Sequence, residues 1–303
     1  MKFDHLIVPL DGSQLAEAAL PAASHLAQAV KARVTLLHVI ERNAPEEVHG
    51  QRHLADVSAA YAYLKGIAAK DFPPDIRVEE HVHSDKVTDV TDSLVKHIQE
   101  LQADLIVMCT HGRGGLNIRL FGSIPQRVLA LGTTPVLLIH PSKSIMNPEF
   151  SCQKLLVPLD GNPEHEQSIP IAIELAKACQ AEVHLIMVVY TRRTLPGEKA
   201  ATATLLPGAT EAALDIKEED AQKYLNQRKS HLKSSGLMVT EEVQRGDPTQ
   251  SIILSARQHK ADLIVIGTHG KTGMDAFWSN SLTPKIASRT HLPLLLVPVG
   301  SQF

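Results

Sequence analysis

The sequence predicts two copies of one α/β domain, because two motifs occur twice and strand-like segments alternate with helix-like ones. LIVPLDG at Leu6–Gly12 returns as LLVPLDG at Leu155–Gly161, and ADLIVMCTHG at Ala103–Gly112 returns as ADLIVIGTHG at Ala261–Gly270. The first pair is separated by 149 residues and the second by 158. The second copy therefore has about nine extra residues between its motifs, a difference that fits within a loop.

In the first copy, short apolar runs alternate with segments whose composition or apolar spacing is helical. The expected strands are His5–Leu10, Val34–Ile40, Ile76–Val82, Leu105–Met108 and Pro135–Ile139. The expected helices are Leu15–Val30, Ala55–Ala69, Val87–Leu101 and one that begins at Ser123. An Asp-Gly turn follows the first strand and a glycine-rich segment follows the fourth.

This alternation predicts a doubly wound, Rossmann-like domain: a five-stranded parallel sheet with helices on both faces. Consecutive parallel strands need right-handed crossovers, which bring the helices onto the sheet. Ligands of such sheets bind beyond the carboxyl ends of the strands. Both repeated motifs end at that edge.

The two domains are expected at residues 1–142 and 152–300. The segment between them, His140–Gln153, contains two prolines, several polar residues and no sustained periodicity. Because this linker is short, the domains should pack against each other. A second segment, Thr191–Thr210, contains two prolines and two glycines, and is expected to be irregular and to hold most of the extra length of repeat two.

Composition excludes several classes of function. The chain has 30 basic and 33 acidic residues and 4% aromatic residues, so it offers neither a broad positive field nor many stacking platforms for nucleic acid. No apolar run approaches the roughly 18 residues that span a bilayer, and polar residues interrupt the N-terminal segment where a signal peptide would be apolar. Three cysteines without a CxxC pair favour reduced thiols and a cytoplasmic protein.

The loop after the fourth strand has features of a phosphate site. Gly112 is followed by nine residues, then by Gly122 and by Ser123 at the start of a helix. Glycines allow backbone amides to approach an anion, and a serine N-cap adds a hydroxyl where the helix dipole favours negative charge. Asp11, beyond the neighbouring strand, offers a carboxylate to a ribose or a base. Alternatively, the glycines only shape a turn and Asp11 only caps the helix that starts near Ser13.

A strand that ends in VPLDGS, a later THG, and a Gly-nine-Gly-Ser loop resemble the universal stress protein family in its tandem form, with the adenine nucleotide alpha hydrolase-like fold. Many members bind ATP through a Gly, two residues, Gly, nine residues, Gly-Ser/Thr pattern, and others bind no nucleotide. In repeat one Cys109 replaces the first glycine, and in repeat two Asn280 replaces the last. The resemblance implies nucleotide contacts by Pro9, Asp11, Val39, Cys109, Gly112, Gly122, Ser123, Asp160, Val189, Gly267, Gly270, Asn280 and Ser281.

These observations predict a stress-response protein in which ATP acts as a regulatory ligand that an unidentified protein partner senses. One alternative is an interaction module of the same fold that binds no nucleotide. Another is a slow adenine-nucleotide hydrolase, although no catalytic machinery stands out. His111 and His269 lie beside turn glycines, where a histidine also orders a loop, and Asp11 and Asp160 are the obvious candidates for a metal ligand or a water-activating group.

Four histidines of repeat one suggest a zinc site. His49 and His53 are spaced i, i+4 at the expected start of the second helix, and His81 and His83 are spaced i, i+2 at the end of the third strand, so each pair is expected to point one way at the same edge of the sheet. The alternative is that they are ordinary surface histidines, because spacing alone overpredicts metal sites.

The last strand of each repeat is expected to join the two domains. Pro135 and Pro293 open these strands, at a position where no ladder donor is required. In the family the last strand commonly pairs two domains, so Val136–Ile139 and Leu294–Val297 are expected to form an internal pseudo-dimer. An apolar edge left over would favour a homodimer.

Overall fold

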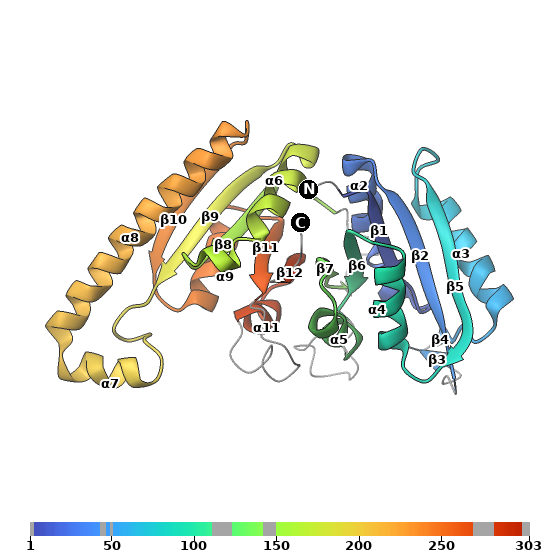
Figure 1. The fold of residues 1–303 in the computed structure, drawn as a ribbon, viewed down its shortest axis with the longest axis horizontal. Coiled ribbons are helices and arrows are strands. Elements are labelled where there is room, and N and C mark those ends of the chain that lie inside the picture. The colour runs from blue at the N-terminus through green and yellow to red at the C-terminus, as the bar shows by residue number, and fades with distance from the viewer. Residues whose placement is uncertain are drawn as a thin grey trace.

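The computed structural model describes residues 3–42, 47–48, 51–110, 123–141, 150–268 and 282–298. Its centre is one sheet of ten strands in the order β10-β9-β8-β11-β12-β7-β6-β1-β2-β5. Five consecutive strands come from each repeat, and the two halves lie side by side with both termini near the middle (Figure 1). Within each half all strands are parallel, as the sequence predicts.

The described elements of repeat one follow the predicted order. They are β1 (His5–Pro9), α1 (Gln14–Glu17), α2 (Leu20–Val30), β2 (Arg33–Glu41), β3 (Glu47–Val48), β4 (Gln51–Arg52), α3 (Val57–Asp71), β5 (Val78–Val87), α4 (Val90–Glu100), β6 (Leu105–Cys109), α5 (Ser123–Leu131) and β7 (Val136–Ile139). The predicted helix Leu15–Val30 is divided into α1 and α2. Pro21 lies in the first turn of α2, where its missing N–H leaves no bond unmade.

Repeat two has the same order with a longer helical insertion. Its elements are β8 (Lys154–Leu159), the 3₁₀ helix η1 (Pro163–His165), α6 (Ser168–Cys179), β9 (Glu182–Val189), α7 (Glu198–Leu205), α8 (Pro207–Ser234), β10 (Val239–Arg245), α9 (Pro248–Gln258), β11 (Leu263–Thr268), α11 (Leu282–Ala287) and β12 (Leu294–Pro298).

The expectation that 191–210 is irregular is wrong for much of its length. Gly197 is the N-cap of α7 with φ +53°, and Pro207 lies in the first turn of α8. Glycine and proline are both tolerated at a helix start, so here they mark beginnings rather than interruptions.

Two helical layers cover the sheet. Helices α2, α3, α6 and α8 bury their apolar side chains against one face, and α4, α5, α9 and α11 bury theirs against the other. Alternate strand residues enter the two cores: Leu6 and Val8 face the first layer, and Ile7 faces the second. Strands buried on both faces explain the continuous apolar runs of the sequence.

The repeats are joined where predicted, through their last strands. β7 and β12 pair antiparallel, with Leu138 opposite Leu294 and Val136 opposite Leu296. Helix α2 packs against α6 across the same junction. The internal pseudo-dimer is therefore confirmed. Because β7 and β12 pair with each other, a homodimer would need a different surface.

The outer edges of the sheet are β5 and β10, and both carry charged side chains. Arg33 of β2 contacts Glu79 of β5 at 3.4 Å, and Lys229 of α8 contacts Glu241 of β10 at 2.5 Å. Charged edge strands disfavour edge-to-edge association. None of the described helices is both long and apolar enough to cross a bilayer.

Candidate functional site

Each half of the sheet has a topological switch point at its first strand. β1 lies between β2 and β6, and β8 lies between β9 and β11. At such a point the chain leaves neighbouring strands in opposite directions, which opens a crevice beyond their carboxyl ends. Asp11 and Asp160 follow the central strands, and Cys109 and Gly267 lie at the ends of the neighbouring ones. These four residues thus lie at the edge of the sheet where the fold class binds ligands.

In repeat one the acidic residue is held in a closed turn. The Asp11 Oδ1 atom accepts hydrogen bonds from the Ser13 backbone N at 2.9 Å and the Ser13 hydroxyl at 2.6 Å. Ser13 is the N-cap of α1 and accepts from the Ala16 N at 3.2 Å. Gly12 supplies the left-handed backbone, φ +88°, that this turn requires. Ser13 rather than Asp11 thus caps α1, and Asp11 holds Ser13 in place through its backbone N–H and its hydroxyl.

Cys109 lies fully buried at the end of β6. Burial raises the pKa of its thiol well above the ordinary value, and the nearby Asp11 carboxylate adds to the effect. A thiol with a raised pKa is a weaker nucleophile at neutral pH than an ordinary cysteine.

In repeat two the acidic residue is held by a histidine. Asp160 Oδ1 accepts from the Asn162 backbone N at 2.9 Å, and Asp160 Oδ2 lies 2.6 Å from His165 Nδ1. The carbonyl oxygen of His165 also lies close to Gly267, near the end of β11. A Cβ added to Gly267 would lie 2.8 Å from that oxygen. Close backbone packing thus explains Gly267, the first glycine of the nucleotide pattern, without a nucleotide.

The other predicted contact residues of the sheet are half-buried at Pro9 and buried at Val39 and Val189. Pro9 pairs with Leu37, and Val39 is 6% exposed. Val189 is 7% exposed, and its carbonyl accepts a hydrogen bond from the Gly246 N at 2.9 Å. In repeat two this bond thus engages the backbone of Val189, one of the nucleotide contacts that the resemblance implies.

Most of the residues predicted to bind the phosphates lie outside the part of the chain that the structure describes. Ser123 begins α5, as predicted. Five further residues of the predicted site lie outside the described residues: Gly112, Gly122, Gly270, Asn280 and Ser281.

The predicted zinc histidines fall into two groups. His53 Nε2 lies 3.9 Å from Glu41 Oε2, and its ring lies 6.3 Å from the buried His38 ring. Burial lowers the pKa of His53, and the His38 charge lowers it further. His49 lies outside the described residues.

His81 and His83 instead meet a histidine that sequence reasoning missed, His97 of α4. His83 Nδ1 lies 2.8 Å from His97 Nε2, and both strand imidazoles lie 4.8 Å from the His97 ring. His97 Nδ1 lies 3.2 Å from Glu100. His97 lies on the inner face of α4 beside Ile98, so the signal in the sequence was a histidine on an apolar helical stripe. The four-histidine zinc site remains a prediction.

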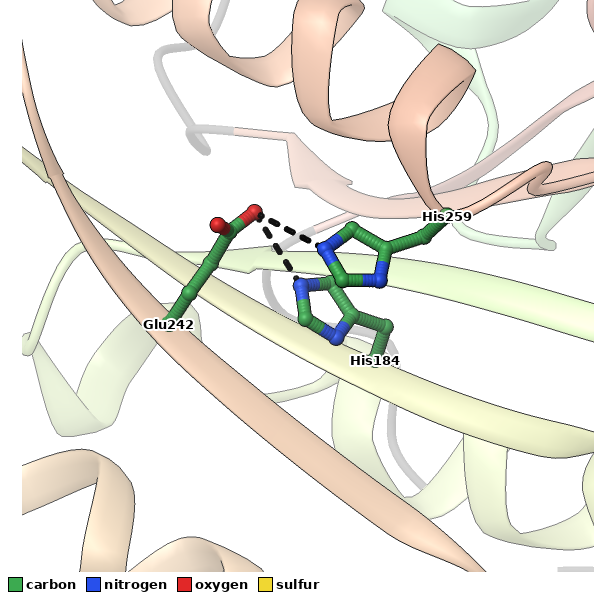
Figure 2. A group of neighbouring side chains, drawn as sticks. All are labelled: His184, Glu242 and His259. Atoms are coloured by element: carbon green, nitrogen blue, oxygen red, sulfur yellow. Dashed lines mark hydrogen bonds and ion pairs between the residues drawn. The ribbon is translucent and has the colours of Figure 1, made fainter.

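Repeat two contains a second cluster that the sequence did not indicate. His184 of β9, Glu242 of β10 and His259, the C-cap of α9, place their ligand atoms within 4.8 Å of one another, the one such trio of potential metal ligands in the described part of the chain (Figure 2). Burial lowers the pKa of His184. Burial alone would raise the pKa of Glu242, but hydrogen bonds from Ser255, Gln244 and His184 bring it below its ordinary value.

Comparison with known proteins identifies the family. The model described as the universal stress protein family matches residues 2–140 and again residues 152–298. The chain belongs to the universal stress protein family. Universal stress protein MJ0531 of Methanocaldococcus jannaschii is 32% identical over 155 residues, which cover 50% of this chain and 86% of that protein.

Several relatives extend over both repeats. Universal stress protein Rv2623 of Mycobacterium tuberculosis is 24% identical over 309 residues, with 96% of this chain and 95% of that protein covered. The crystal structure of a universal stress protein from Archaeoglobus fulgidus superposes with a TM-score of 0.68 and 17% identity, and covers 99% of this chain and 97% of that one. The tandem arrangement is therefore shared with other universal stress proteins.

Proposed function

We propose that this universal stress protein binds an adenine nucleotide, ATP, as a regulatory ligand at the switch point of repeat one. The supporting observation is the position of Asp11 and Cys109 at the carboxyl ends of β1 and β6, next to the segment that carries Gly112 and Gly122. Asp11 would accept hydrogen bonds from the ribose or base, and the glycine-rich segment would hold the phosphates.

The choice of repeat one depends on one difference between the two crevices. In repeat two, Asp160 is engaged by His165 and the His165 carbonyl packs on Gly267. The residue that matches His165 in repeat one is Ala16, so no histidine contacts Asp11 from this position, and Asp11 Oδ1 accepts from Ser13 instead. A ligand in repeat two would first have to break the contact between Asp160 and His165. Repeat two thus fits the alternative of an interaction module without nucleotide.

The proposal also includes a protein partner and a cellular location. A regulatory ligand acts by favouring one conformation that another protein recognises. None of the three cysteines, Cys109, Cys152 and Cys179, is in a disulfide, which supports a cytoplasmic location.

Calorimetric titration of the nucleotide-free full chain with ATP and Mg²⁺ tests the proposal. We expect one nucleotide per chain. Asp11→Ala should weaken binding at least tenfold, and the matched variant Asp160→Ala should change it less than threefold. Circular dichroism of both variants checks that the fold is kept, and release of ADP over time in the same samples tests for slow hydrolysis.

Two outcomes would contradict the proposal. Absence of binding at millimolar ATP would favour the interaction module in both repeats. Loss of binding in Asp160→Ala with binding retained in Asp11→Ala would place the nucleotide in repeat two.

A further inference from the structure

The cluster of His184, Glu242 and His259 joins three elements at the outer part of repeat two. His184 is the third residue of β9, Glu242 lies in the edge strand β10, and His259 ends α9, which packs on β9. All three side chains lie on the α9 face of the sheet and point toward one another (Figure 2). The Glu242 Oε1 atom lies 3.1 Å from His184 Nε2 and 3.6 Å from His259 Nε2.

These separations match the geometry of a metal centre. Ligand atoms at about 2.0–2.2 Å from a tetrahedral ion are about 3.3–3.5 Å apart. The two measured separations lie on either side of that range. The imidazole rings stack with centroids 3.6 Å apart and planes 20° from parallel, so an ion bound by both Nε2 atoms would require the His259 ring to rotate out of the stack. The His259 side chain is 40% exposed and has room for that rotation.

Neighbouring polar groups hold two of the ligands in position. His184 Nδ1 lies 2.7 Å from Thr240 Oγ1, so a proton on Nδ1 would leave the Nε2 lone pair for a metal. The Ser255 hydroxyl donates to Glu242 Oε1, and Gln244 Nε2 donates to Glu242 Oε2 at 3.0 Å. Outer partners of this kind fix the tautomer of a ligand histidine and the orientation of a ligand carboxylate.

We propose that His184, Glu242 and His259 bind one divalent transition-metal ion, with zinc as the best match. Two imidazoles and one carboxylate suit zinc, whereas Ca²⁺ and Mg²⁺ require sets of oxygen ligands. With three protein ligands, a fourth position is left for water or for a group from another molecule.

The ion would connect the end of α9 to the two outer strands of the sheet. The cluster lies on the α9 side, toward the amino ends of the strands, because His184 lies near the start of β9 and α9 runs back to that edge. The proposed nucleotide crevice lies beyond the opposite, carboxyl ends. The metal proposal is therefore independent of the proposed function, and either can fail alone.

The test uses the untagged full chain, freed of metal by chelation and dialysis, and Zn²⁺ alone as the probe. Competition with a chromophoric chelator is expected to give one tightly bound zinc per chain. His259→Gln should weaken this binding at least tenfold, and it should leave the fold intact because His259 is at the surface. The matched control is His231→Gln, an exposed histidine in the last turn of α8, which should bind as the parent does.

A second variant and a spectrum make the outcome decisive. His97→Gln removes the central imidazole of the repeat-one cluster and should leave the tight zinc site unchanged. The Co²⁺-loaded parent should show visible absorption of a low-coordinate site, which His259→Gln should alter. Absence of stoichiometric zinc from the parent would overturn the proposal, and so would equal affinity in the parent and His259→Gln.

Discussion

The outer parts of the two repeats share the same backbone arrangement but carry different polar side chains. In repeat one Leu37 of β2 pairs with His81 of β5, and at the matching place in repeat two Ile186 of β9 pairs with Glu242 of β10. The three histidines of the repeat-one cluster each match a residue in or beside the repeat-two cluster. His81 matches Glu242, His83 matches Gln244, and His97 matches Ser255. The duplication kept an interface between an edge strand and a helix and changed the polar groups inside it.

The backbone is more conservative than these side chains. Among the residues that the structure describes, four non-glycine residues have left-handed φ values, and they form two matched pairs: Lys31 with φ 58° and Gln180 with φ 54°, and Gln102 with φ 52° and Lys260 with φ 54°. A left-handed residue with a side chain costs about 1–2 kcal/mol. Both repeats bear this cost at the same helix ends, which shows that the helix–strand connections were preserved while the clusters diverged.

The largest expected effect tests what the repeats share. Leu137 of β7 and Leu295 of β12 are opposite each other at the junction, and both are at most 1% exposed. Replacement of either by alanine removes apolar burial and leaves a cavity, so each variant should lose about 2–5 kcal/mol of unfolding free energy. Denaturant unfolding measures the loss. If one variant lost several kcal/mol more than the other, the symmetry of the junction would be wrong.

A proton linkage distinguishes the repeats. Burial lowers the pKa of His140 to about 4, and the His291 charge contributes. The matching position in repeat two is Pro298, which does not titrate. Because the unfolded histidine has a pKa near 6.5, the folded state holds fewer protons between these values. The contribution of His140 to the unfolding free energy is therefore complete above pH 6.5, and it is lost as the pH drops toward 4.

His140 alone should account for about 1.4 kcal/mol per pH unit, and at most about 3 kcal/mol in total. Unfolding free energies of the parent and His140→Gln, measured from pH 7 to pH 4.5, give this contribution as their difference. His5 and His81 also have pKa values lowered by burial, so both proteins should lose stability in acid. Parallel pH profiles would show that His140 titrates normally.

A third comparison concerns the first glycine of the nucleotide pattern. Gly267→Ala should cost about 1–3 kcal/mol, because its Cβ would meet the His165 carbonyl at 2.8 Å. Cys109→Ala, at the matching place in repeat one, removes only a sulfur atom from a position that already holds a Cβ, and should cost about 1 kcal/mol. Thermal unfolding of the two variants sharpens the contrast. An unchanged stability of Gly267→Ala would mean that the η1 segment lies farther from β11.

The smallest expected effect concerns the left-handed helix ends. Lys31→Gly and Gln180→Gly relieve left-handed strain but increase the entropy of the unfolded chain, so each should stabilise by less than about 1 kcal/mol. Lys31→Ala keeps the strain and serves as the control. Destabilisation by both glycine variants in denaturant unfolding would contradict the account of these positions.

Much of the fold follows from the sequence for a physical reason. Strands buried on both faces leave continuous apolar runs, and the junction of β7 with β12 follows from apolar last strands that each begin after a proline. The insertion in repeat two was misjudged because Gly197 and Pro207 are helix breakers in general but helix starters at these two positions.

The candidate sites were predicted only in part. Asp11 and Asp160 lie beside a repeated motif, so the sequence indicates where they lie but not that Asp160 contacts His165. The cluster of His184, Glu242 and His259 has no motif, because its members come from two strands and a helix end that are distant in the chain. Its one local signal is His184, a polar residue within the apolar strand β9.

Native mass spectrometry of the full chain, with ATP and Zn²⁺ both supplied, tests most directly whether the two repeats have diverged in chemistry. The account predicts one nucleotide and one zinc per chain, with only the nucleotide lost in Asp11→Ala and only the zinc lost in His259→Gln. Two nucleotides per chain, neither ligand bound, or loss of both ligands in a single variant would contradict it.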